Sequence, residues 1–280
     1  MAARGLADRR AKLDGGLRVL LAIPFGLAIG VSIGMLGGGG SVLAVPVLVY
    51  VLGQDVSEAT TASLVVVTAA AVAGGLGHAR KGRVCWRHAA SFTAAALPGV
   101  VAGTLAGDAV SGAALLAAFA LVMLAAAAAT WHRAGDDDQE DATWERAGTC
   151  PPLRLPRDLV AGAAIGFLTG FFGVGGGFLI VPTLAIALAF TMRTAVGTSL
   201  AIITGTSLLG LAVHLIAGRS LDPGLTFALT AAGVIGALAG ASFAARVPQQ
   251  TLGRAFAVLV TGVAAYLLVS AAFLGGPPGS

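Results

Sequence analysis

Long apolar runs are the feature that most constrains the fold of this chain of 280 residues. Each continues for about 18 residues or more with few or no charges, which lets a helix cross a hydrocarbon core of ~30 Å. Charged residues make up only 11% of the sequence, about half of what a soluble domain needs to keep its surface hydrated. We therefore predict an all-α, polytopic helical membrane protein. The clearest runs are Ala59–Leu76, Ala89–Ala106, Ala113–Trp131, Ala195–Ala217, Phe227–Phe243 and Ala255–Phe273.

Two further apolar regions, Val19–Leu52 and Leu159–Phe190, are longer and are interrupted by glycines. Together with the clear runs they predict about eight transmembrane segments. A polar, largely acidic stretch divides the chain near its midpoint and separates two membrane halves. The predicted organisation is a basic cytoplasmic N-terminal arm (1–18), a first transmembrane repeat (19–131), a hydrophilic cytoplasmic linker (132–158), a second repeat (159–273) and a C-terminal tail (274–280).

The two halves align with each other without a gap at an offset of 136 residues. Gly30-x-x-x-Gly34-x-x-Gly37-x-Gly39-Gly40 aligns with Gly166-x-x-x-Gly170-x-x-Gly173-x-Gly175-Gly176, and the same register pairs Pro46 with Pro182, His78 with His214 and Arg83 with Arg219. A biased composition produces matched glycines and alanines easily, but not matched Pro, His and Arg in one register. We infer an internal duplication.

Basic residues in short loops predict the orientation. The N-terminal arm and the loop after Leu76 are both rich in Arg and Lys, so we expect both in the cytoplasm, with Gly53–Glu58 and Gly107–Gly112 outside. This arrangement gives parallel repeats in a bacterial cytoplasmic membrane. If Val19–Leu52 is instead a full hairpin, the number of membrane crossings in each half changes from even to odd, and the repeats are inverted.

The cysteines, Cys85 and Cys150, both fall in loops that this orientation places in the cytoplasm. Disulfides are rare in that compartment, and two isolated cysteines make no metal site. We therefore expect neither a disulfide nor a bound metal.

The duplicated glycine clusters interrupt apolar runs at matching positions. A run of glycines weakens a helix, and unwound backbone inside a membrane is tolerated only where protein or a wet cavity surrounds it. Helices that restart after such a break offer free N–H groups, which suit an anion, and paired broken helices indicate a transporter's substrate site. Alternatively, the glycines only permit close helix crossing, the reading that we favour for Gly30-x-x-x-Gly34 alone.

Hydroxyl side chains near the starts of the following helices are further candidates, because they donate to an anion without burying a charge. Their alternative role is a bond back to a carbonyl one turn earlier. The complete predicted substrate-binding set is Gly37, Gly38, Gly39, Gly40, Ser41, Thr61, Ser63, Gly173, Val174, Gly175, Gly176, Gly177, Thr198 and Ser199.

The matched prolines and histidines are candidates for breaking helices or for coupling. Pro46 and Pro182 follow the glycine clusters, where each either ends a short helix or only kinks it. His78 and His214 lie near helix ends. Each either exchanges protons during transport or caps the last carbonyls of its helix, and we favour the cap.

The duplicated G-x-x-G-x-G-G-G-x-x-x-x-P pattern, followed by a Thr-Ser-Leu or Ala-Ser-Leu element, resembles the TauE/SafE family of sulfite and organosulfonate exporters, also called the toluene-sulfonate uptake permease family. The resemblance covers nearly the whole chain. Gly197-Thr198-Ser199-Leu200 fits the pattern well, whereas in the first half Ser41 replaces the last glycine and Thr61-Ala62-Ser63-Leu64 replaces the Gly-Thr-Ser-Leu form. The resemblance implies a secondary transporter that moves small sulfur-containing anions out of the cytoplasm.

Other functions stay open at this point. A passive anion channel or a carrier of non-sulfur organic anions would use the same glycine clusters. An intramembrane hydrolase is a remote alternative, because Ser207 and His214 lie two turns apart on one helix, beyond hydrogen-bond distance. The expected partners are a small anionic substrate, a coupled proton or sodium ion and the lipid bilayer, and a homodimer is compatible with the composition. We expect no nucleic acid, no cofactor, no metal and no enzymatic activity.

Overall fold

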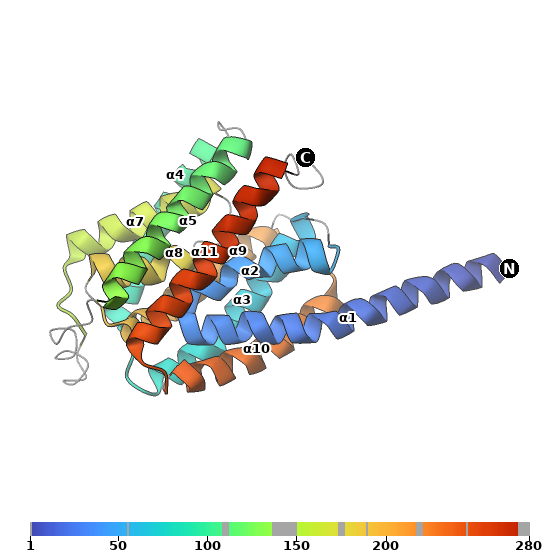
Figure 1. Ribbon diagram of the computed structural model, residues 1–280, viewed down its shortest axis with the longest axis horizontal. Helices are drawn as coiled ribbons and strands as arrows, with labels where there is room; N and C mark the ends of the chain where they lie inside the picture. The colour runs from blue at the N-terminus through green and yellow to red at the C-terminus, as the bar shows by residue number, and fades with distance from the viewer. Residues whose placement is uncertain are drawn as a thin grey trace.

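The computed structural model of the protein describes residues 2–54, 56–107, 112–135, 150–172, 177–188, 190–216, 221–244 and 246–273. Within these ranges every regular element is a helix, so the predicted helical class is confirmed (Figure 1). The longer helices are α1 (Ala2–Leu36), α3 (Val56–Ala79), α4 (Trp86–Gly107), α5 (Gly112–Gly135), α7 (Leu155–Phe172), α9 (Met192–Ile216), α10 (Pro223–Ala244) and α11 (Gln249–Phe273).

Four helical stretches within the described residues are long and apolar enough to cross a membrane: Arg18–Val49, Glu58–Ala79, Met192–Ile216 and Pro223–Ala244. Shorter apolar helical stretches accompany them at Ala118–His132, Gly177–Ala187 and Gln250–Ala265. As far as the structure describes its residues, each clear apolar run of the sequence falls on one helix, from α3 to α11. The total of about eight spans remains a prediction.

The first interrupted region is a hairpin. Helix α1 ends at Leu36, the glycines turn as a short 3-10 helix (η1, Gly37–Gly40), and the chain returns through α2 (Ser41–Pro46) and a π-helical turn (η2, Val47–Val51). The returning arm lies beside α1, because a Cβ at Gly40 would be 2.8 Å from the carbonyl oxygen of Ile29. At its end, a Cβ at Gly53 would be 3.6 Å from the guanidinium of Arg18. The chain therefore returns to the end of the bundle where it entered.

This hairpin places the N-terminal arm and the loop after α3 at opposite ends of the bundle. Helix α3 starts near Arg18 and runs alongside α1, so that a Cβ at Gly74 would be 3.2 Å from the Cα of Gly34. The loop with Arg83 follows at the far end of α3. We expected both basic segments on one side of the membrane. That expectation counted the interrupted region as a single crossing and is wrong for this geometry.

Helices from opposite halves pack closely through small residues. A Cβ at Gly30 on α1 would overlap the carbonyl oxygen of Gly233 on α10, and a Cβ at Gly166 on α7 would overlap that of Ala96 on α4. Gly30 and Gly166 are counterparts at the offset of the duplication. Gly30-x-x-x-Gly34 therefore acts as a close-packing motif, as we favoured for it alone.

Helices α3 and α9, counterparts in the two halves, cross each other in opposite directions. A Cβ at Gly74 would be 3.4 Å from the side chain of Leu200, and a Cβ at Gly210 would be 3.4 Å from the side chain of Leu64. Residues early in each helix thus contact residues late in the other. The two contacts are equivalent, because the offset of 136 residues relates Gly74 to Gly210 and Leu64 to Leu200. This antiparallel crossing is the one that inverted repeats require.

Candidate functional site

The glycine turn of the first hairpin meets the start of α8 in the interior of the bundle. In the second interrupted region, the described chain ends α7 at Phe172 and resumes with α8 (Gly177–Pro182) and a π-helical turn (η3, Thr183–Ala187). A Cβ at Gly38 would overlap the carbonyl oxygen of Gly177, so the two backbones are in contact there. Gly37, Gly38, Gly39 and Gly40 are all buried. Of the predicted residues, Gly173, Val174, Gly175 and Gly176 lie outside the described part of the chain.

Side chains from three further positions enclose this junction. A Cβ at Gly37 would be 2.5 Å from Ser199 Oγ on α9, and one at Gly39 would be 3.2 Å from the ring of Phe256 on α11. A Cβ at Gly177 would be 2.7 Å from Ser41 Oγ. The junction thus combines backbone from both halves with the hydroxyl groups of Ser41 and Ser199. Their role in substrate binding stays a prediction.

Three predicted hydroxyls donate to carbonyls of their own chain segment. Ser41 Oγ donates to Gly38 O at 2.7 Å, Ser63 Oγ to Thr60 O at 2.8 Å and Ser199 Oγ to Val196 O at 2.8 Å. Each acceptor lies three residues earlier, so the alternative role of these side chains is the one that the structure holds. A bound anion would recruit Ser41 or Ser199 only if the hydroxyl rotated away from its carbonyl.

The two predicted threonines lie away from the junction. Thr198 Oγ1 accepts the backbone N–H of Cys85 at 3.1 Å, in the loop before α4. Thr61 Oγ1 lies 3.0 Å from Nδ1 of His214, near the other end of the α3–α9 crossing. Both threonines are fully buried. They tie α3 to α9 and α9 to the loop before α4.

The matched histidines and prolines occupy structural positions. His78 is 1% exposed, and its Nε2–H donates to Gly34 O, near the end of α1, at 3.1 Å. The contact resembles the predicted cap, although it serves α1 and not the histidine's own helix. Pro46 and Pro182 end α2 and α8, and each is followed directly by a π-helical turn.

Cys85 and Cys150 form a disulfide, contrary to our expectation. Their Cα atoms are 5.8 Å apart, which lies within the range that a disulfide spans. The expectation rested on placing both cysteines in the cytoplasm, and that placement depended on the misread hairpin. The bond joins the α3–α4 loop of the first half to the segment that leads into α7.

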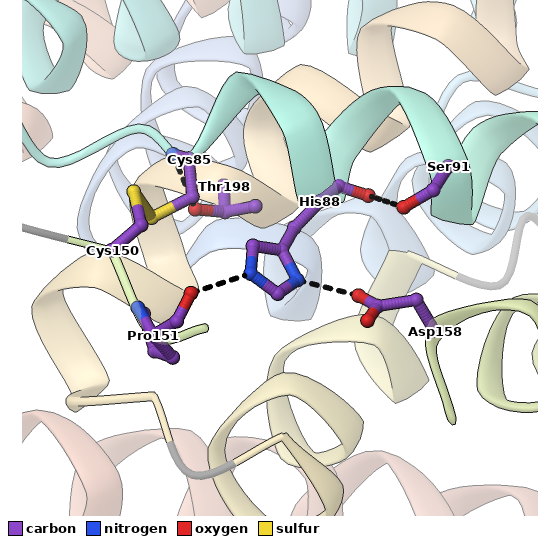
Figure 2. A network of polar contacts seen from close by, with 7 residues as sticks. All are labelled: Cys85, His88, Ser91, Cys150, Pro151, Asp158 and Thr198. Carbon is purple, nitrogen blue, oxygen red and sulfur yellow. Dashed lines mark hydrogen bonds and ion pairs between the residues drawn. A yellow bond between two sulfur atoms is a disulfide. The ribbon is translucent and has the colours of Figure 1, made fainter. Parts of the chain in front are cut away.

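A second polar cluster lies beside the disulfide and was missed in the sequence. His88, in the first turn of α4, has Nδ1 2.5 Å from Asp158 Oδ1 and Nε2 3.1 Å from Pro151 O (Figure 2). The ring is 3% exposed and Asp158 is 0% exposed. From the sequence we assigned Asp158 to the last position of the hydrophilic linker. A signal did exist, because pairing Cys85 with Cys150 would have brought these two segments together.

Two pockets flank this cluster. One, of about 210 Å³, is lined by His88, Asp158, Leu188 and two arginines, Arg154 and Arg157. The other, of about 410 Å³, lies over the disulfide and includes Trp86 and Arg87. The cluster is therefore buried but borders space that is open to water-sized molecules.

Comparisons with known proteins agree with a membrane transporter. A family model described as "Sulfite exporter TauE/SafE" matches residues 22–267. A probable membrane transporter protein of Xylella fastidiosa (strain 9a5c) is 33% identical over 253 residues, which cover 89% of this chain and 95% of the relative. A probable membrane transporter protein of Methanocaldococcus jannaschii is 30% identical over 213 residues, which cover 71% of this chain and 74% of the relative. No solved structure gives a significant match.

Proposed function

The chain belongs to the sulfite exporter TauE/SafE family, and on this premise we propose that it is a secondary transporter that exports small sulfur-containing anions such as sulfite or sulfonates. The anion binds where the first glycine hairpin meets the start of α8. Backbone N–H groups at this meeting point are its main donors, because they carry no charge of their own and glycine leaves room for an oxyanion.

The contact between Gly38 and Gly177 is the observation that carries this proposal. It brings together the two glycine clusters that the duplication placed far apart in sequence, and it puts the hydroxyls of Ser41 and Ser199 beside them. With Gly38 against the start of α8, the path between the halves is closed at this point. An anion that passes must first separate these two segments, which fits a carrier with alternating access better than a passive channel.

The antiparallel crossing of α3 and α9 supports inverted repeats. In transporters of this kind, two inverted halves rock against each other around a central site. The contacts of Gly74 with Leu200 and of Gly210 with Leu64 join the two halves across this crossing. We propose two inverted repeats joined by the linker, in place of the parallel arrangement that the loop charges favoured.

The disulfide supports an orientation for the chain. Disulfides persist outside the cytoplasm, so we propose that the end of the bundle with Cys85 and Cys150 faces outward in a bacterial cytoplasmic membrane. Arg18 and the N-terminal arm lie at the other end of the bundle. In this orientation they face the cytoplasm, which is the side that the sequence predicted for them. The three basic residues of the α3–α4 loop, Arg80, Lys81 and Arg83, then face outward, against the usual charge rule. Lys81 Nζ donates to Ala241 O there.

A thermal-shift panel followed by flux measurement tests the function. Purified protein is heated with sulfite, methanesulfonate, lactate, chloride or sodium, since a ligand of the folded state raises the melting temperature. Efflux of labelled sulfite from proteoliposomes is then compared for wild type, Gly38→Ala and Gly262→Ala. Gly262 has nothing within 4 Å of its Cβ position, so its variant is the matched control.

We expect stabilisation by a sulfur oxyanion and loss of sulfite efflux in Gly38→Ala only. If Gly38→Ala does not fold, Gly177→Ala replaces it, because its Cβ meets the side chains of Ser41 and Ile203 and not backbone. Stabilisation by a cation alone, or normal efflux in the folded glycine variants, would refute the proposed site. Preference for lactate over both sulfur anions would establish the alternative of a non-sulfur organic anion carrier.

A further inference from the structure

The contacts of His88 depend on how many protons the His88 ring and the Asp158 carboxyl group hold together. Its Nε2 faces the carbonyl oxygen of Pro151, which can only accept, and its Nδ1 faces a carboxylate oxygen of Asp158 (Figure 2). A neutral imidazole has one N–H, and an ionised carboxylate has none. These two contacts therefore cannot both be hydrogen bonds when the histidine is neutral and the aspartate is ionised.

Both contacts are satisfied only when the pair holds one additional proton. Either the ring is an imidazolium that donates to Asp158 and to Pro151, or a protonated Asp158 donates to Nδ1 while Nε2–H donates to Pro151. The two forms contain the same number of protons and differ only in whether Nδ1 or Oδ1 carries the shared hydrogen. Loss of that proton breaks one of the two contacts, whichever nitrogen keeps its hydrogen.

We propose that His88 and Asp158 form the proton-binding site through which the transport cycle is coupled to protons. This inference rests on the proposed transport function and identifies the coupling ion. The proton enters and leaves between Nδ1 and Oδ1 through the adjoining pocket, where Asp158 Oδ2 is buried and has no hydrogen-bond partner among the described residues.

The site is placed where proton binding can alter the contact between the halves. His88 lies in the first turn of α4 in the first half, Asp158 lies in the first turn of α7 in the second half, and Pro151 follows the disulfide-bonded Cys150. The ring also meets the edge of Phe190, which follows η3, with centroids 5.0 Å apart. The protonated pair holds these elements together, and its deprotonation releases one of them.

The charged groups around the pair are basic. Arg154 and Arg157 line the pocket from the α7 side, and Arg87 lines the neighbouring pocket from α4. From the segment before α9, Phe190 presents a neutral ring. Within the part of the chain that the structure describes, Asp158 is thus the one acid that these pockets contain, and it is the natural partner for the additional proton.

The test is the pH dependence of anion flux and the accompanying proton movement in proteoliposomes. Methanesulfonate is used beside sulfite, because it stays ionised from mildly acidic to mildly alkaline pH. In Asp158→Asn the amide N–H donates to Nδ1 of a neutral ring and imitates the protonated pair. Asp222→Asn is the matched control, since Asp222 also accepts at a helix start, from Gly224 N–H at 2.9 Å, but is exposed.

We expect wild type and Asp222→Asn to show a one-proton transition in flux and to move protons with the anion, and Asp158→Asn to lose both. An unchanged pH profile in folded Asp158→Asn would overturn the proposal. A substrate-free measurement decides it if that variant does not fold. Ring ¹⁵N signals of wild-type His88, assigned by their loss in His88→Gln, are combined with the infrared carboxyl band of Asp158.

A neutral His88 beside an ionised Asp158 across the whole pH range would also overturn it. Absence of any sulfite or sulfonate flux in wild type would instead refute the proposed function. In that case the spectroscopic result would still determine whether the pair binds the additional proton, so the two failures are distinguishable.

Discussion

The hydroxyl of Ser199, on α9, lies against Gly37, at the turn of the first hairpin. A Cβ at Gly37 would be 2.5 Å from Ser199 Oγ and 2.9 Å from a methyl carbon of Val181. Gly37 also has a φ of +70°, a conformation that costs an L-residue about 1–2 kcal/mol. Space and backbone conformation therefore demand glycine at this position for two independent reasons.

Gly37→Ala should accordingly destabilise the protein by about 2–4 kcal/mol, the sum of strain and overlap. Adding Ser199→Gly should recover only the part due to the hydroxyl and leave the conformational part. Unfolding in detergent, measured for both single variants and the double variant, separates the two. Full recovery in the double variant would mean that the backbone at Gly37 carries no strain.

The packing glycines on the two outer helix pairs should respond alike. Gly30→Val and Gly166→Val each push a side chain into the backbone of a helix from the other half, Gly233 and Ala96 respectively. We expect each to lower stability by about 2 kcal/mol or more, whereas Gly262→Val, in open space, should have little effect. Thermal unfolding tests this. A large difference between the first two variants would argue against equivalent roles in the two halves.

The disulfide should contribute substantially to stability. Cys85 and Cys150 are separated by 65 residues, and closing a loop of that length restricts the unfolded chain by about 4 kcal/mol in the entropic account. A reductant should lower the melting temperature of wild type to that of Cys85→Ser and leave Cys85→Ser itself unchanged. Equal melting temperatures of oxidised wild type and Cys85→Ser would show that the bond adds nothing to folding.

The glycine clusters show which features of the fold could be predicted from the sequence. The duplicated register predicted correctly that Gly37–Gly40 interrupts an apolar helix, because glycine runs and proline are local signals. It could not tell a hairpin from a single crossing, since both have the same apolar length. That choice depends on whether the chain after Gly40 packs back on Ile29, which is a tertiary contact.

The His88–Asp158 pair shows the opposite case. Neither residue stands in a motif, and the two are 70 positions apart. Burial of Asp158 depends on α4 packing along α7, which the glycines at Gly99 and Gly166 make possible. Long apolar helices could be predicted from local composition, whereas a polar pair across two halves follows only from how those helices meet.

The orientation of the bundle has a direct chemical test. In Cys85→Ser the single remaining thiol, Cys150, is exposed and lies at the proposed outer end. A membrane-impermeant maleimide should label it in intact cells. The matched variant carries Arg18→Cys with both native cysteines replaced by serine, and it places a thiol at the opposite end. It should react only after the membrane is opened.

The reverse labelling pattern would place the disulfide in the cytoplasm. The bond would then need a reason to persist among cytosolic reductants, and the basic α3–α4 loop would obey the charge rule that the outward orientation violates. Labelling of both thiols in intact cells would mean that Arg18 and Cys150 share one side of the membrane. That result would contradict the hairpin, because a chain that returns beside Arg18 before α3 must leave Cys150 at the other end.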